Sequence, residues 1–196
     1  MELKNIGYYL NTLDDKSYIF MLVAHNAAPT IGKVKPSSLV VFKKTIRRDL
    51  FSNWERYKYD IVSSLNVNFY ELKRTEDSVY VLFYDYIKLN NVFRNTENMA
   101  FLNRFGYSDE MNIYEALSLL KKRYEQACPH EIGIFLGYPV SDVFDFIECP
   151  NKECLMRGYW KVYNDIEYAK ETFKSYDEAK IKVVRHTAEK IEGKFV

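Results

Sequence analysis

The amino-acid sequence predicts an α/β protein of the α+β type: a mixed sheet of about five strands, including one β-hairpin, flanked by six or seven helices. Three observations carry this prediction. Helical spacing of apolar residues recurs along most of the chain, two β-type runs stand close together, and later β-type runs alternate with helices. No repeat or Pro/Gly-rich linker interrupts the sequence, so residues 1–196 are expected to form a single globular domain.

The N-terminal part predicts two helices followed by a loop. Residues 2–13 and 16–25 carry apolar side chains at helical spacing, and Asp14 or Asp15 can cap the second helix. Two prolines interrupt residues 26–38, so this segment is expected to be a loop.

The next part predicts a strand, a helix and a hairpin. Residues 38–44 are typical of a strand, and the apolar side chains of residues 47–65 share one face of an amphipathic helix. Two β-type runs, 67–74 and 78–85, are separated only by the turn-forming residues 75–77. This arrangement indicates a hairpin.

The C-terminal half is expected to alternate helices and strands. Residues 86–105 predict a helix that stops near Gly106, and residues 112–127 carry the clearest apolar stripe of the chain. The apolar run 131–138 predicts a buried strand, after which Pro139 starts a helix at its first turn. The inward face of that helix is expected to consist of Val140, Val143, Phe144 and Ile147.

The chain is expected to close with a strand and a long helix. Residues 158–163 are typical of a strand, and Asp165 can cap a helix that extends to residue 191. We expect a break in this helix near Ser175.

Charge and composition bear on compartment and partners. With 28 Lys and Arg against 27 Asp and Glu, the net charge is +1, which gives no overall attraction to nucleic acid or to an acidic membrane. The apolar run at 18–24 is too short to span a bilayer, and no export signal precedes it. We therefore expect a cytoplasmic protein with reduced cysteines and with neither a nucleic-acid nor a membrane partner.

Motifs with a known mechanism are missing from the sequence. It contains no phosphate-binding glycine loop, no H-E-x-x-H, no G-x-S-x-G and no C-x-x-C. No cofactor is therefore expected. The spacing C-x-H and C-x4-C, with a predicted strand and helix between, does not favour a metal site. The weak candidate set for a metal consists of Cys128, His130, Cys149 and Cys154.

The loop after the second helix is a candidate anion site. His25 lies at a helix C-terminus, where the helix dipole favours the protonated imidazole. Ammonium and hydroxyl groups follow at a density that suits a phosphate or carboxylate. The loop groups are Thr30, Lys33, Lys35 and Ser38. The alternative interpretation is a helix end followed by a solvated loop.

The dipeptide His130-Glu131 is the candidate for acid–base chemistry. Because neighbouring strand residues point to opposite faces, these two side chains are not expected to form a dyad with each other. An inward-pointing member needs a partner from elsewhere, and His25 or Lys161 could supply it. The alternative interpretation is a structural histidine or glutamate that fixes a loop by hydrogen bonds.

Four stretches of the chain resemble a known family. PHEIGIFLGYPVSDVFDFI, GYWKVYNDIEYAKETFKSY, HNAAPTIGKVKPSSL and AFLNRFGY are similar to motifs of an uncharacterised bacterial family, domain of unknown function 3793, from anaerobic Gram-positive bacteria. The resemblance implies a compact cytoplasmic bacterial protein, and it supplies no activity, cofactor or catalytic residue. Within the motifs, the residues hardest to explain by backbone needs are His25, Thr30, Lys35, His130, Glu131 and Lys161.

Two functions are therefore open at this point. The first is a ligand-binding or regulatory module that takes a small anion or a protein partner where the 25–38 loop meets residues 129–133. The second is an enzyme that uses His25 or His130 as general acid or base on an anionic small molecule. Both require the two segments to meet around one depression, and the sequence leaves the oligomeric state open.

Overall fold

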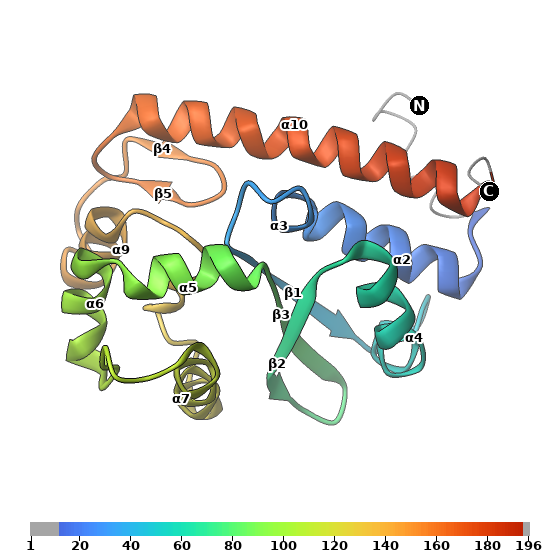
Figure 1. The fold of residues 1–196 in the computed structure, drawn as a ribbon, viewed down its shortest axis with the longest axis horizontal. Helices are drawn as coiled ribbons and strands as arrows, with labels where there is room; N and C mark the ends of the chain where they lie inside the picture. Colours follow the sequence, from blue (N-terminus) through green and yellow to red (C-terminus); the bar gives the residue numbers. More distant parts are fainter. Residues whose placement is uncertain (1–11, 194–196) are drawn as a thin grey trace.

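The computed structural model describes residues 12–193 and confirms the α+β class (Figure 1). The helix expected at 2–13 lies, for the most part, outside the described residues. The α-helices are α2 Asp15–Asn26, α3 Ala28–Ile31, α4 Leu50–Leu65, α5 Tyr86–Arg94, α6 Thr96–Leu102, α7 Ile113–Gln126, α8 Ile132–Phe135, α9 Val140–Glu148 and α10 Ile166–Ile191, with a 3-10 turn η2 at Asn103–Phe105.

The described strands form two antiparallel sheets instead of one mixed sheet. The larger has the order β1-β3-β2, and its β2–β3 hairpin is the one that the sequence predicted. The smaller pairs β4 with β5, where the sequence predicted one continuous strand. The strands are β1 Ser37–Lys43, β2 Asn68–Arg74, β3 Ser78–Tyr84, β4 Met156–Arg157 and β5 Lys161–Val162.

The three-stranded sheet separates two apolar cores. Because side chains alternate along a strand, Val79, Val81 and Phe83 of β3 face the core shared with α2 and α4. Leu82 and Tyr84 face the other core, shared with α5, α7 and α8. Helices therefore cover both faces of the sheet, and α10 runs along α2 and α3 (Figure 1).

Side-chain caps set several helix ends, and those at Asp14 and Asp165 were predicted from the sequence. The side chains of Asp14 and Asp165 accept backbone hydrogen bonds at the starts of α2 and α10. Asn112 forms a capping box at the start of α7. The helix predicted at 86–105 is divided, because the Asn95 side chain caps a new helix, and Gly106 ends the segment in the left-handed conformation with a φ of 90°.

Residues 131–138 do not form the predicted strand. After a turn, they form the short helix α8, and the backbone N–H of Gly133 donates to the carbonyl of His130. The prediction was wrong because a short apolar run has no periodicity that separates a buried strand from a buried helical turn. The 26–38 loop likewise contains a helical turn, α3, in which Pro29 occupies a first-turn position.

Two further expectations need correction. Helix α10 is continuous from 166 to 191, with no break near Ser175. In α9, Val143 is buried as expected, whereas Phe144 is 43% exposed and lies near the Arg104 guanidinium. Asp142 of the same helix, which was not expected to face inward, is buried and accepts hydrogen bonds from Trp160, Tyr163 and Asn164.

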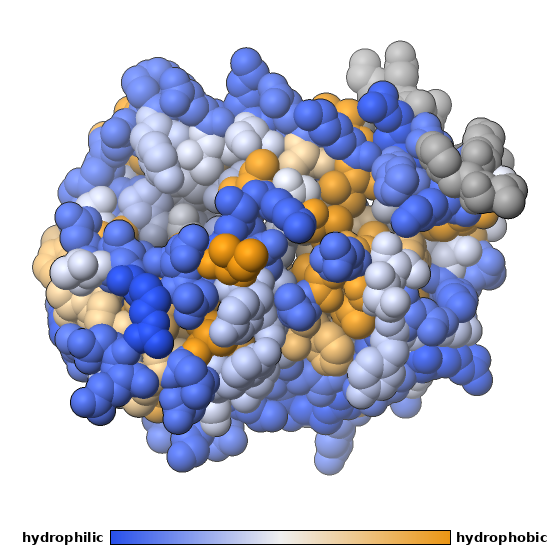
Figure 2. All heavy atoms as spheres, viewed as in Figure 1, coloured by the Kyte–Doolittle hydropathy of each residue, from blue (hydrophilic) through white to orange (hydrophobic). Residues whose placement is uncertain are grey.

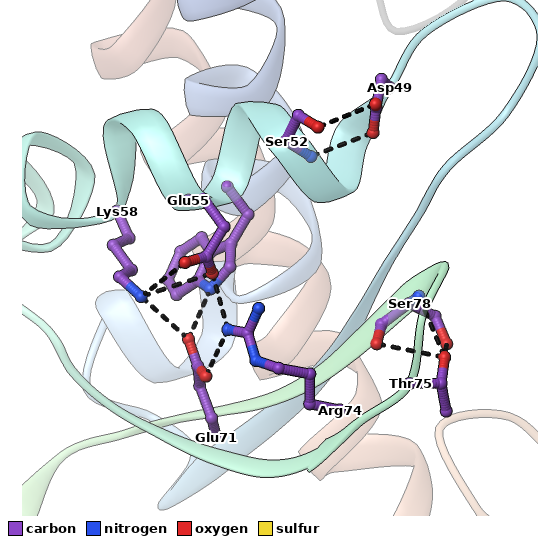
Figure 3. Close-up of polar contacts among 9 residues, drawn as sticks. Asp49, Ser52, Glu55, Lys58, Glu71, Arg74, Thr75 and Ser78 are labelled. Carbon is purple, nitrogen blue, oxygen red and sulfur yellow. Dashed lines mark hydrogen bonds and ion pairs between the residues drawn. The ribbon is translucent and has the colours of Figure 1, made fainter.

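A charged network joins α4 to β2 at one side of the sheet (Figure 3). Trp54, fully buried and stacked on Phe42 at 4.8 Å, donates its indole N–H to Glu71 over 3.0 Å. Arg74 also donates to Glu71 and bridges it to Glu55. These positive charges and hydrogen bonds outweigh the burial of the Glu71 carboxyl, so its pKa is lowered.

The face of the molecule shown in Figure 2 is mainly hydrophilic, with apolar atoms visible in patches near its middle. Within residues 12–193, no helix has both the length and the apolar character needed to cross a bilayer.

Replacing Glu71 by Ala is expected to destabilise the fold by about 1–3 kcal/mol, because the buried indole N–H of Trp54 would lose its acceptor. Chemical denaturation of the variant measures this loss. Glu76→Ala, in the exposed hairpin turn, is the control and should change the free energy of unfolding little. Equal effects of the two substitutions would show that the network does not support Trp54.

Candidate functional site

The 26–38 loop docks on the segment that follows α8. Ser37 donates its hydroxyl proton to the carbonyl of Phe135 over 2.7 Å, in a buried position. Thr30 and Ser38 share a buried hydroxyl–hydroxyl hydrogen bond of 2.8 Å across the loop. The hydroxyls of Thr30 and Ser38, predicted as ligand-binding groups, therefore hold the loop together.

Gly137, in the segment after α8, allows Pro36 of the loop to approach closely. Its φ is 76°, and a Cβ atom there would lie 2.6 Å from the Pro36 Cγ. The loop thus meets residues 135–138, whereas the sequence placed the contact at 129–133.

Lys35 is the most unusual side chain that this docking produces. It is only 6% exposed, and its Nζ lies 5.3 Å from the ring centroid of Tyr138 and 5.7 Å from that of Tyr176. No carboxylate of residues 12–193 lies within ion-pair distance of this Nζ. Burial, followed by the nearby charge of Lys180, lowers the pKa of Lys35 to about 8.

The two tyrosines beside Lys35 bring further hydrogen-bond donors. Burial raises the pKa of Tyr138 to about 12, and burial also raises the pKa of Tyr176. Both phenols therefore keep their protons at neutral pH. Neither hydroxyl forms a hydrogen bond with another group of the described residues. Within residues 12–193, no carboxylate accepts a hydrogen bond from the Lys35 ammonium or from either of these hydroxyls.

Helix α10 adds a second positive charge to this region. Tyr176 and Lys180 are four residues apart and so share one helix face, which lies along α3. The charge of Lys180 acts on both Lys35 and His25. Sequence reasoning missed both α10 residues, because only their spacing relates them and nothing local marks the helix face that meets the loop.

His25 behaves differently from the sequence expectation. It lies in the last turn of α2, but its half-burial, followed by the charge of Lys180, lowers its pKa. The helix dipole was expected to favour the protonated form, and desolvation outweighs it here. Lys33, also predicted as a ligand group, is exposed, away from the buried ammonium of Lys35.

Glu131 and His130 point to different surroundings. Glu131 is 1% exposed and forms an ion pair with Arg123 of α7. This hydrogen-bonded ion pair raises the pKa of Arg123. Glu131 thus corresponds to the structural alternative, since it ties the turn before α8 to α7.

His130 and Lys161 come together at a separate cavity of about 180 Å³. The imidazole lies edge-on to Phe146, with 5.1 Å between ring centroids, and the Lys161 Nζ lies 5.0 Å from the same ring. The pairing of His130 with Lys161 was one of the partnerships considered from sequence. The lining includes Tyr138, but neither His25 nor Lys35.

The cysteines do not form a metal-binding group. All three thiols are free, and Cys128 lies 3.2 Å from the Tyr124 hydroxyl. Across residues 12–193, no three His, Cys, Asp or Glu side chains are arranged to hold a metal ion. The weak candidate set Cys128, His130, Cys149 and Cys154 is therefore not assembled.

A family model described as "Protein of unknown function (DUF3793)" matches residues 23–194, which include the loop, α8 and α10. No curated protein and no solved structure matches the chain. The matched family is the one that the sequence motifs resemble.

Lys35→Met is expected to make the protein more stable than the wild type at neutral pH. Between pH 8 and 10.5 the unfolded wild type holds a lysine proton that the folded protein has released, so wild-type stability rises with pH across this window. The difference between wild type and variant should therefore shrink by roughly 3 kcal/mol as pH rises through the window. Denaturation at several pH values measures it; a constant difference would contradict the burial penalty.

Gly137→Ala is expected to be more destabilising than Gly106→Ala. Both glycines have a positive φ, but a Cβ at Gly106 meets nothing within 4 Å. Placing alanine at a positive φ should lower the free energy of unfolding by about 1–2 kcal/mol at either position. The clash of the new Cβ with Pro36 should lower it by about 1–3 kcal/mol more at Gly137. Equal losses in thermal unfolding would mean that the loop is not held against this glycine.

Proposed function

The chain belongs to the DUF3793 family, and we propose that it binds a small anionic ligand, through a phosphate or carboxylate group, at Lys35. One observation carries the proposal: the Lys35 ammonium is buried, and no carboxylate of residues 12–193 pairs with it. An anion is the chemical group that this environment lacks.

The energetics support a ligand over a purely structural role. Lysine is almost never fully buried without a partner, because removing an ammonium from water is costly. A methionine of similar length would fill the same space without that cost. Since the pKa of Lys35 is about 8, the side chain is mostly charged at neutral pH and can form charge-assisted hydrogen bonds.

The surroundings complete the fit for an anion. Tyr138 and Tyr176 provide protonated hydroxyls, and Lys180 adds positive charge from α10. Binding an anion would raise the pKa of Lys35 towards its ordinary value. The affinity is therefore expected to fall as the pH rises through about 8.

The enzyme hypothesis has less geometric support. His130 is exposed, and its contact is the ring of Phe146 rather than an orienting carboxylate. His25 has Asn26 as its hydrogen-bonding neighbour and feels a second positive charge. A general acid–base is usually oriented and tuned by a carboxylate, and no carboxylate of residues 12–193 forms an ion pair with either histidine.

A thermal-shift comparison tests the proposal. Phosphate, pyrophosphate, acetate and citrate are added to wild type, Lys35→Met and Lys33→Met. At least one anion should raise the wild-type melting temperature by about 3–6 °C at a roughly tenfold excess over its Kd. The control Lys33→Met alters an exposed lysine of the same loop and should respond as the wild type does.

Lys35→Met is expected to lose the specific part of this response. Phosphate stabilises many proteins through exclusion from their surfaces, so only the difference between the two lysine variants counts. If the same anions stabilise Lys35→Met and wild type equally, the proposed site is wrong.

A further inference from the structure

We infer a second binding site, for a small aryl carboxylate, in the cavity between α8, α9 and β5. The aromatic ring of the ligand would occupy the apolar interior, and its carboxylate would lie at the mouth between His130 and Lys161. The cavity is lined by His130, Ile132, Gly133, Tyr138, Asp142, Val143, Phe146, Trp160 and Lys161.

The interior suits one flat ring. Tyr138 and Trp160 stack with 5.3 Å between centroids and form an aromatic wall, and the buried side chains of Ile132 and Val143 face the same space. The volume is about 180 Å³. A protein cavity of roughly 150 Å³ holds benzene, so the space accepts a single six-membered ring.

Asp142 places a buried negative charge in the lining of the cavity. Its carboxylate is buried, and it accepts from the Trp160 indole N–H over 2.7 Å, from the Tyr163 backbone N–H and from both the backbone and side-chain N–H groups of Asn164. The carboxylate thus fixes the Trp160 wall and has no unmet need for a ligand donor. Its negative charge also disfavours an anionic group of the ligand inside the cavity beside Asp142.

The mouth is basic. His130 and Lys161 are both exposed, and both contact the ring of Phe146. Neither forms an ion pair with a carboxylate of the described residues. A ligand with an apolar ring and one negative group therefore matches the cavity only with its ring inward and its charge outward.

This site is separate from the Lys35 site, although Tyr138 contributes to both. One ring contact of Tyr138 is with the Lys35 ammonium, and another is with Trp160 in the cavity wall. Variants at the cavity mouth leave Lys35 in place, so the two proposals can fail independently.

Nitrogen-15 NMR of the two tryptophan indoles tests the inference in the full chain. Trp160 lies in the cavity wall, whereas Trp54 lies fully buried in the other core and serves as an internal reference. Benzoate should shift the Trp160 indole signal saturably and leave the Trp54 signal in place. Benzyl alcohol, which lacks the charge, and acetate, which lacks the ring, should each bind more weakly than benzoate.

Three exposed-residue variants and one buried variant complete the test. His130→Ala and Lys161→Ala should each lower the affinity for benzoate about two- to fivefold, which is the size of effect typical of an exposed charge pair. Lys174→Ala, on the exposed side of α10, is the control and should bind benzoate as the wild type does. The Trp160 shift should persist in Lys35→Met. The inference is overturned if benzoate leaves Trp160 unmoved, if benzyl alcohol binds equally well, or if Lys35→Met abolishes the shift.

Discussion

The burial of the Lys35 ammonium, with no counter-charge among the described residues 12–193, is the constraint on which the proposed site depends. Three separate segments create it. The 26–38 loop carries Lys35, the segment after α8 supplies Tyr138, and α10 supplies Tyr176 and Lys180. The hydrogen bond from Ser37 to Phe135 and the close approach of Pro36 to Gly137 hold the first two segments together. The site thus depends on tertiary packing.

The other buried charges of the described residues show how different Lys35 is. Glu131 is paired with Arg123, and Asp142 accepts four hydrogen bonds. Both follow the rule that a buried charge is compensated by a partner. The Lys35 ammonium, which has no carboxylate partner among residues 12–193, differs from both, and this contrast is what supports the proposed anion.

The fold class, the hairpin and the main helix caps could be predicted because they depend on local chemistry. Asp14 and Asp165 mark helix starts by side-chain hydrogen bonds to nearby backbone N–H groups, and that signal is contained in a few residues. Residues 131–138 were predicted as a strand because a short, fully apolar run fits either conformation. Only the surrounding helices decide it.

The candidate residues and the pairing of His130 with Lys161 could be named from sequence, but the separation of Lys35 from His130 could not. Lys35 and His130 were singled out together, yet Lys35 lies beside Tyr138 and Tyr176, whereas His130 lines a separate cavity with Phe146. The role of Lys180 follows from the face of α10 that meets the loop, and no local pattern shows which face that is. Long-range packing therefore determines the charge environment of each candidate.

The most direct measurement is an NMR titration of the Lys35 side chain, followed through its carbon-13 Cε signal, with and without phosphate. In an anion-free buffer, the pKa of Lys35 should be about 8 because the ammonium is buried, and phosphate should raise it. A pKa at the ordinary value of 10.5 in both solutions would show that the ammonium is neither desolvated nor responsive to an anion, and would contradict the central claim.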